Sequence, residues 1–241
     1  MKVENGLDLK WRIESETHSQ FSIFNSQLKK VALLNQWQND DGSTTAIWKI
    51  EEPESFFTHA TGLAFPDIRN EKRRIERLAG RFLLKFLQDD FPLHQILPDA
   101  HDKPRIAGNK YFFSISHSWP YVAAIVSPHT EAGIDIQRWH PRMHLLQQKF
   151  LSPGEQLITR NDNKMITLAW TAKEAAYKWQ GSRKVDFIAQ LPITRMDSIS
   201  APDIFDIEIN IKSNQKNMLA SIKGTVYEDF AMSLASTAQN K

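Results

Sequence analysis

Residues 170–178 read WTAKEAAYK, a stretch that places three chemically distinct side chains at regular intervals. Trp170, Glu174 and Lys178 follow one another four residues apart, so a helix carries all three on one face. The periodicity predicts a helix over residues 166–180, and Gly181 is suited to end it. A carboxylate and an ammonium group are therefore expected to lie together on this helix.

A second stretch, residues 132–137, reads AGIDIQ and alternates between apolar and polar side chains. This alternation predicts a strand, with the two isoleucines on one side and Asp135 and Gln137 on the other. A carboxylate on a strand that faces a carboxylate on a helix is one way to hold a hard divalent cation. Mg²⁺ is usually bound by one or two carboxylates, while phosphates and water complete its octahedron. Asp135 and Glu174 are therefore candidate metal ligands.

Taken alone, each of these residues has a simpler explanation. Asp135 could be a strand-end or turn residue, a position where aspartate is common. Glu174 and Lys178 could form an ordinary helix pair, which contributes about 0.3 kcal/mol. Trp170 is expected to anchor the helix in the core. The metal-site interpretation depends on Asp135 and Glu174 occurring together.

The composition is that of an ordinary globular protein and excludes several kinds of site. Of 241 residues, 41% are hydrophobic and 24% charged, which allows a real core. The lack of cysteine excludes disulfides, thiolate zinc sites and cysteine nucleophiles, and it fits a reducing cytoplasm. A net charge of +2 is too small to indicate nucleic-acid binding. Neither a membrane-spanning apolar run nor a signal peptide is visible, so a cytoplasmic protein is expected, with no membrane partner.

Residues 70–89 give the clearest helical pattern in the chain. Apolar residues recur at helical spacing from Ile75 to Leu87, and Asn70 is suited to cap the N-terminus. A second face is basic, with Arg74, Arg77, Arg81 and Lys85. This face could be merely solvated, or it could bind phosphate, since guanidinium groups bind phosphate bidentately.

The rest of the chain predicts a mixture of helices and strands. Strands at 111–116 and 121–126, followed by the strand of Asp135, predict an antiparallel meander. Ser152 and Glu155 have the spacing of a capping box. Other expected elements are strands at 7–11, 44–50, 204–212, 218–226 and 229–236, and a helix at 142–150. Each half thus offers a helical region followed by strands, although no sequence repeat is visible.

Further short motifs accompany the two main stretches, in a fixed order along the chain. They are Ala79-Gly80-Arg81, Lys103-Pro104 and Phe113-Ser114-Ile115-Ser116-His117-Ser118. Together with GID at 133–135 and WTAKEAAYK at 170–178, they resemble the 4′-phosphopantetheinyl transferases. The resemblance is to the larger, monomeric type, which activates carrier proteins of siderophore, peptide or polyketide pathways. It covers roughly residues 28–198.

The resemblance implies an α+β fold of two similar halves related by a pseudo-twofold. Each half is expected to be a small, mainly antiparallel sheet packed against helices, with coenzyme A in the cleft between them. Residues 1–27 would be an N-terminal extension, 28–128 the N-terminal half and 129–241 the C-terminal half with the metal-binding motifs. Two halves in one chain lead us to expect a monomer.

The resemblance also implies roles for the candidate metal site. Asp135 and Glu174 would bind Mg²⁺, and Glu174 would also be the general base. Lys178 would contact the pyrophosphate of coenzyme A. Gln137 departs from the family, because many members carry an acid there as a third metal ligand. Its amide oxygen or a water molecule would take that place, and weaker Mg²⁺ affinity is expected.

Other residues are implied to bind coenzyme A. Ser116 and His117 would contact its phosphates, although a histidine near a turn is often merely exposed. Lys103 would meet the 3′-phosphate and its surroundings. Three more residues are assigned less directly: Arg74 and Arg81 to the same phosphate, and Lys173 either to the pyrophosphate or to solvent.

The implied reaction is attack by a serine hydroxyl of an acyl or peptidyl carrier protein on the β-phosphate of coenzyme A, releasing 3′,5′-ADP. A docking surface for the carrier would combine apolar and basic residues, as residues 138–150 do. These include Arg138, Arg142, Met143, Leu145, Leu146, Lys149 and Phe150. An ordinary amphipathic helix is the alternative explanation. Rival functions are a non-catalytic module that binds coenzyme A or a carrier, which Gln137 favours, and nucleic-acid binding, which the low charge disfavours.

Overall fold

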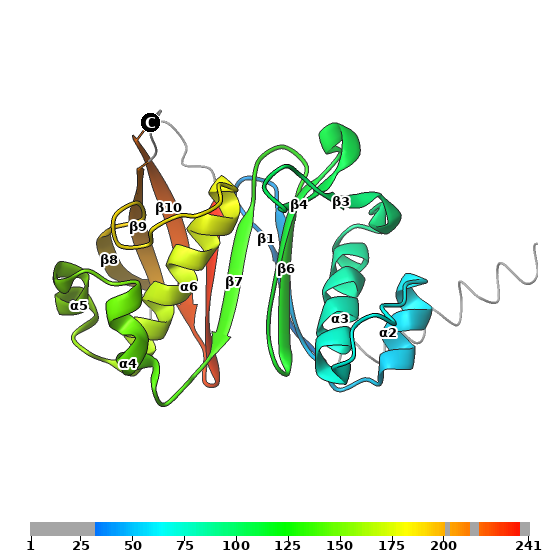
Figure 1. Cartoon of the computed structure of the whole chain (residues 1–241), viewed down its shortest axis with the longest axis horizontal. Helices are drawn as coiled ribbons and strands as arrows, with labels where there is room; N and C mark the ends of the chain where they lie inside the picture. Colours follow the sequence, from blue (N-terminus) through cyan, green and yellow to red (C-terminus); the bar gives the residue numbers. More distant parts are fainter. Residues whose placement is uncertain (1–31, 201–202, 213–216, 237–241) are drawn as a thin grey trace, which may run out of the picture.

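The computed structural model describes residues 32–200, 203–212 and 217–236, which form an α+β fold (Figure 1). Two antiparallel sheets pack face to face in the centre, and helices cover their outer faces. The strand order is β1-β2-β6-β5 in the first sheet and β7-β11-β10-β9-β8 in the second. The predicted combination of antiparallel sheets and helices is confirmed. The extension at 1–27 and the strand expected at 7–11 lie outside the described residues.

The first sheet contains β1 (Leu33–Gln38), β2 (Thr44–Lys49), β5 (Phe112–Ser118) and β6 (Tyr121–Ser127). The second contains β7 (Gly133–Arg138), β8 (Ile193–Ser200), β9 (Ile204–Lys212), β10 (Asn217–Val226) and β11 (Phe230–Ser236). A small hairpin is formed by β3 (Ile96–Pro98) and β4 (Pro104–Ile106). The helices are α2 (Glu54–Thr61), α3 (Glu71–Leu87), α4 (Met143–Leu146), α5 (Pro153–Thr159) and α6 (Asn163–Gln180).

Helix α3 begins where the sequence predicts. The side chain of Asn70 accepts a hydrogen bond from the backbone N–H of Arg73 at 3.0 Å and so caps the first turn. The apolar stripe is buried against the first sheet, where the rings of Phe82 and Trp48 lie edge to face with centroids 5.1 Å apart. The basic face is thereby turned away from the core.

Helices α5 and α6 also follow their sequence signals. Ser152 Oγ accepts the N–H of Glu155, and the Glu155 carboxylate accepts the N–H of Ser152, which confirms the capping box. Asp162 caps α6, and Gly181 ends it in the left-handed conformation at φ 75°. These local signals fix where the helix that carries Glu174 begins and ends.

The predicted three-strand meander is wrong in its last step. β5 and β6 pair as expected, but β6 pairs on its other edge with β2. Both edges of β6 are therefore occupied, and β7 pairs instead with β11 of the second sheet. The chain crosses between the two sheets at residues 128–132, directly before the strand of Asp135.

Other differences arise where the sequence pattern is weak. The helix expected at 142–150 is one short turn, α4, followed by a 3₁₀ turn at Gln147–Lys149. β1, α2 and β8 were not predicted. β1 shows why, because it is a largely exposed edge strand with polar residues at half of its positions. Within the described ranges, no helix is both long and apolar enough to cross a membrane.

Candidate functional site

The site begins with a very close approach of strand β7 to helix α6. A Cβ atom added to Gly133 would lie 2.1 Å from the carbonyl oxygen of Ala175 and 2.8 Å from the backbone nitrogen of Trp179. Only glycine permits this contact, because the two atoms that a Cβ would meet belong to the backbone of α6 and cannot move aside. The backbone of β7 therefore rests directly on α6. This contact sets Asp135, two residues further along β7, against the helix face that carries Glu174 and Lys178.

Asp135 is nearly buried, with 7% of its surface exposed, and its Oδ1 accepts two short hydrogen bonds. Lys178 Nζ donates to it at 2.6 Å, and Ser116 Oγ of β5 donates at 2.6 Å. Lys178 Nζ also donates to the carbonyl oxygen of Ile134 at 3.0 Å. The structure thus brings together three of the predicted site residues, from β5, β7 and α6.

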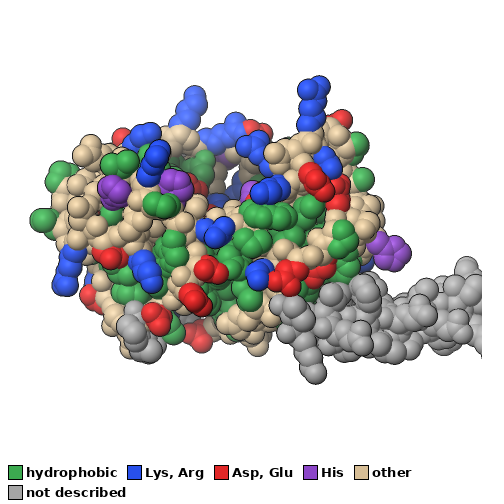
Figure 2. Space-filling model, turned by 90° about the horizontal axis from the view of Figure 1, so that it is seen from below, with side chains coloured by type: hydrophobic (Ala, Val, Ile, Leu, Met, Phe, Trp, Pro, Cys, Tyr) green, Lys and Arg blue, Asp and Glu red, His purple; other side chains and the backbone are tan. Residues whose placement is uncertain are grey.

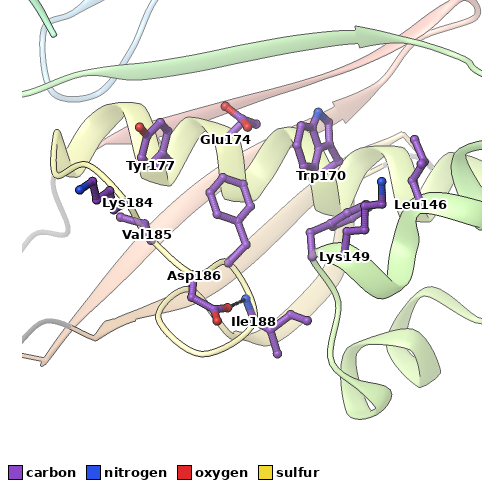
Figure 3. Close-up of a pocket in the computed structure, with 11 residues that line it drawn as sticks. Leu146, Lys149, Trp170, Glu174, Tyr177, Lys184, Val185, Asp186 and Ile188 are labelled. Atoms are coloured by element: carbon purple, nitrogen blue, oxygen red, sulfur yellow. Dashed lines mark hydrogen bonds between the residues drawn. The ribbon is translucent and has the colours of Figure 1, made fainter. Parts of the chain in front are cut away.

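Glu174 lies close enough to Asp135 and Lys178 for their charges to shift the pKa of its carboxyl. Burial and then the negative charge of Asp135 raise the pKa of its carboxyl to about 7, although the positive charge of Lys178 opposes the shift. Figure 3 shows the Glu174 carboxyl on the side of α6 that faces away from residues 184–188. The two carboxylates repel each other in a desolvated place, a situation that a bound cation relieves.

The donor atoms present fit a hard divalent cation such as Mg²⁺. Asp135 and Glu174 supply two carboxylates, and Mg²⁺ typically needs only one or two from the protein. Among the residues described, no group of three or more His, Cys, Asp or Glu side chains could hold a metal ion. The Gln137 amide nitrogen donates to Ser118 Oγ at 3.4 Å and to the Arg138 carbonyl at 3.1 Å.

The raised pKa of Glu174 predicts an effect of pH on stability in a metal-free buffer with EDTA. The folded-state pKa of about 7 exceeds the ordinary value of 4.5, so the folded chain retains a proton that the unfolded chain releases. This stabilising contribution is complete below pH 4.5 and disappears as the pH rises through 7. Between pH 4.5 and 8, the free energy of unfolding of the unaltered chain, measured with urea, should fall by an amount on the order of 3 kcal/mol because of Glu174. Glu174→Gln should not show this part of the decrease. The same pH dependence in both proteins would contradict the assignment.

A row of serines on β5 joins the two sheets at this point. Ser114, Ser116 and Ser118 lie on one face of the strand because side chains alternate. Ser114 Oγ accepts the N–H of Ile134 at 3.2 Å, and Ser118 Oγ accepts the N–H of Arg138 at 3.0 Å. Side chains of the first sheet thus satisfy backbone groups on the free edge of β7.

A cavity of about 240 Å³ lies between α3, β5 and the end of α6, next to Lys178. Arg81 of α3 and Lys103, which precedes β4, contribute positive charge to its lining. Burial, and then Arg77, lower the pKa of Arg81 to about 10, and no hydrogen bond or ion pair to another described residue holds its guanidinium. Figure 2 shows Lys and Arg side chains around a hollow on this face of the molecule. This cavity suits an anionic ligand.

Lys103 has protein partners within the same cavity. Its Nζ donates to Glu131 Oε2 at 2.8 Å and to the carbonyl oxygen of Trp179 at 3.1 Å. Burial lowers the pKa of Lys103, while Glu131 counteracts this shift. Lys103 therefore links the segment before β4 to the end of α6 as well as lining the cavity.

Two predicted ligand-binding residues have other partners outside this cavity. Arg74 forms a two-point ion pair with Glu54, with both distances 2.8 Å, and so joins α3 to α2. His117 points to the other face of β5 from Ser116, and its Nδ1 lies 3.3 Å from Glu76 Oε2. The structure therefore separates Ser116 and His117, which the sequence treats as one phosphate-binding pair.

The prediction that Lys173 binds coenzyme A or faces solvent needs correction. Its side chain is 0% exposed and pairs with Glu155 on α5 at 2.5 Å. Adjacent residues of a helix point about 100° apart, so the face that presents Glu174 turns Lys173 into the core. Lys173 is not available to a phosphate in this structure.

A larger groove of about 870 Å³ follows another side of α6 (Figure 3). Leu146 and Lys149 line one wall, and residues 184–188 line the other. Tyr177 lines this groove and the smaller cavity, and Glu174 also lines the groove. Sequence reasoning missed Tyr177 and residues 184–188, although Tyr177 lies within the WTAKEAAYK stretch, three residues after Glu174.

Comparison with known proteins points to one family. The chain is 33% identical over 117 residues to the 4′-phosphopantetheinyl transferase AcpT of Salmonella typhi, and equally so to that of Salmonella typhimurium. The match covers 45% of this chain and 60% of each relative, so it spans less than two thirds of their length. No protein-family model matches the chain. The similarity supports placing the chain in the 4′-phosphopantetheinyl transferase superfamily.

Proposed function

We propose that the chain, as a member of the 4′-phosphopantetheinyl transferase superfamily, transfers the phosphopantetheine arm of coenzyme A to a serine of an acyl or peptidyl carrier protein. The new bond joins the serine oxygen to the β-phosphorus, and the bond from that phosphorus to 3′,5′-ADP breaks. The observation that supports this most is Glu174, whose pKa is raised to about 7 beside Asp135. Such a pKa suits a group that accepts a proton near neutral pH.

In this proposal, Glu174 takes the proton from the attacking serine hydroxyl, which is a weak nucleophile without a base. Asp135 and Glu174 would hold Mg²⁺, which when bound supplies positive charge for the diphosphate oxygens. Lys178, within hydrogen-bond distance of Asp135, would place its ammonium beside the same phosphates. Ser116 orients the Asp135 carboxylate through its 2.6 Å hydrogen bond.

The cavity between the halves would receive the phosphates of the nucleotide. Arg81 offers a guanidinium without a counter-ion among the described residues, and Lys103 lies in the same lining. A guanidinium in a partly desolvated place binds phosphate through two parallel hydrogen bonds. His117, which does not line this cavity, stays a proposed phosphate contact. Arg74 is a weaker candidate, because its guanidinium already binds Glu54.

We also propose that the two halves are related by a pseudo-twofold, with the boundary near residues 128–129, and that the chain acts as a monomer. The supporting observation is that each sheet is covered on its outer face by its own long helix. The cavity that contains Arg81 and Lys178 then lies between the halves.

The carrier protein would dock on α4 and its neighbours. Leu145 and Leu146 are 65% and 40% exposed, with Arg142 and Lys149 beside them. Apolar centres with basic surroundings suit the acidic helical surface that family resemblance implies for carriers. The sequence also assigns Met143 and Phe150 to this surface, but both are buried in the core and are therefore not part of the docking surface.

Charge reversal on this surface should weaken carrier binding alone. Arg142→Glu is expected to raise the KM for the carrier by about 10-fold, since rim charges act on association, and to leave the KM for coenzyme A unchanged. Steady-state kinetics with each substrate varied in turn would measure both constants. A parallel change in both, or no change, would argue against docking on α4.

Mass spectrometry of an apo-carrier incubated with the protein, coenzyme A and Mg²⁺ tests the function. A gain of one phosphopantetheine group on the carrier serine is the expected result. Binding of coenzyme A or carrier without any gain of mass would favour the non-catalytic module that Gln137 suggests. A panel of carriers in the same assay would identify the class of substrate.

A further inference from the structure

The core of the second half contains an ion pair that the proposed chemistry does not use. Lys173 Nζ lies 2.5 Å from Glu155 Oε1, and the two side chains are 0% and 4% exposed. Lys173 Nζ also donates to the carbonyl oxygens of Phe150 at 2.7 Å and Phe187 at 2.9 Å. An ammonium group has three N–H donors, so every donor has an acceptor here. A fully satisfied buried charge is costly to assemble and holds its partners in defined positions.

The two carbonyl groups belong to opposite walls of the 870 Å³ groove. Phe150 follows α4 and the 3₁₀ turn that carries Lys149, whereas Phe187 lies within residues 184–188. Figure 3 shows the two walls at different positions along α6, with Val185 toward Tyr177 and Lys149 toward Trp170. The rings of both phenylalanines contact Trp170, with centroids 4.9 Å and 5.7 Å away. The Lys173 ammonium thus ties both walls to the same helix.

Glu155 is itself anchored, which makes the arrangement rigid. Its Oε2 accepts the N–H of Ser152 at 2.7 Å in the capping box, and its Oε1 accepts the N–H of Ile193 at 2.8 Å. The carboxylate therefore connects α5 and the start of β8 to Lys173. The residue adjacent to Lys173 on α6 is Glu174, which lines the groove.

We propose that Lys173, with Glu155 as its counter-charge, is a positioning residue that sets the separation of the groove walls beside Glu174. The proposal rests on the proposed transferase function. Glu174, the residue proposed to accept the proton, belongs to the lining of this groove, and its carboxyl points away from residues 184–188. A displacement of either wall then changes the alignment of the reacting atoms, and misplacement of about 1 Å can reduce a rate by about 100-fold. Binding of the nucleotide phosphates near Arg81 does not depend on these walls.

The informative variant removes both charges. Lys173→Met alone leaves a buried carboxylate without a partner and is expected to fold poorly. Lys173→Met/Glu155→Gln keeps side chains of similar length without an unpaired charge. It should lower kcat for transfer at least about 10-fold, while the Kd for 3′,5′-ADP, measured calorimetrically with Mg²⁺, stays within about two-fold. A lower kcat with an unchanged Kd indicates a loss of positioning, whereas a general loss of structure would change both constants.

An exposed ion pair provides the matched control. Lys223 and Asp206 pair on the surface of β10 and β9, and Lys223→Met/Asp206→Asn should leave both constants unchanged. A normal kcat in the Lys173/Glu155 double variant would overturn the positioning role and leave the transferase function standing. A loss of 3′,5′-ADP affinity as large as the loss of kcat would have the same meaning. Absence of transfer by the unaltered chain would overturn the proposed function and this role together.

Discussion

Replacing Glu174 with glutamine is expected to reduce phosphopantetheine transfer by about 10³-fold, because the change removes the proposed base and one metal ligand together. The glutamine keeps the size of the side chain, so α6 and its contact with β7 stay intact. Coenzyme A should still bind through the cavity that contains Arg81 and Lys103. The loss is therefore expected in kcat, measured by labelling of the apo-carrier over time.

Two comparisons make this prediction specific. Asp135→Asn should cause a loss of similar size, together with a higher Mg²⁺ concentration for half-maximal rate, since it also removes a carboxylate from the same site. Glu51→Gln, which changes an exposed glutamate paired with Lys49 at the end of β2, should have no effect. Transfer by Glu174→Gln at more than a tenth of the original rate would rule out Glu174 as the base.

Replacing Gly133 with alanine is expected to destabilise the fold by about 3 kcal/mol or more. The added Cβ would lie 2.1 Å from the Ala175 carbonyl oxygen, and helix backbone cannot rotate aside as a side chain can. β7 and α6 must then separate, which moves Asp135 away from Glu174 and Lys178. Urea unfolding should show the loss of stability, and the labelling assay should show that transfer falls in the remaining folded protein.

Gly154 provides the control for this substitution. It lies in the first turn of α5, and a Cβ there would meet nothing within 4 Å. Gly154→Ala should therefore change stability by less than about 1 kcal/mol, in the stabilising direction, because alanine favours a helix. Equal behaviour of the two alanine variants would show that β7 does not need to lie against α6.

Local sequence patterns predicted those parts of the fold that local interactions determine. The capping box at Ser152 and Glu155, the Asn70 cap and the Gly181 terminus are confirmed, since each depends on atoms within a few residues. The periodicity of WTAKEAAYK likewise predicted which residues share a face of α6.

The relation between strands was decided by contacts between distant residues. β7 pairs with β11, about a hundred residues further along the chain, because β2 and β5 already occupy both edges of β6. Alternation within residues 132–137 indicates a strand but cannot indicate its neighbour. The predicted meander failed for this reason.

The sequence by itself determined that Asp135, Glu174 and Lys178 are the chemically distinctive residues and that a strand and a helix carry them. Only the tertiary structure decided which cations remain open to a ligand. Lys173 is buried against Glu155 and Arg74 is paired with Glu54, whereas Arg81 lines the cavity. Helical spacing orders side chains around an axis, but burial of the apolar surface chooses which side of that axis meets the core.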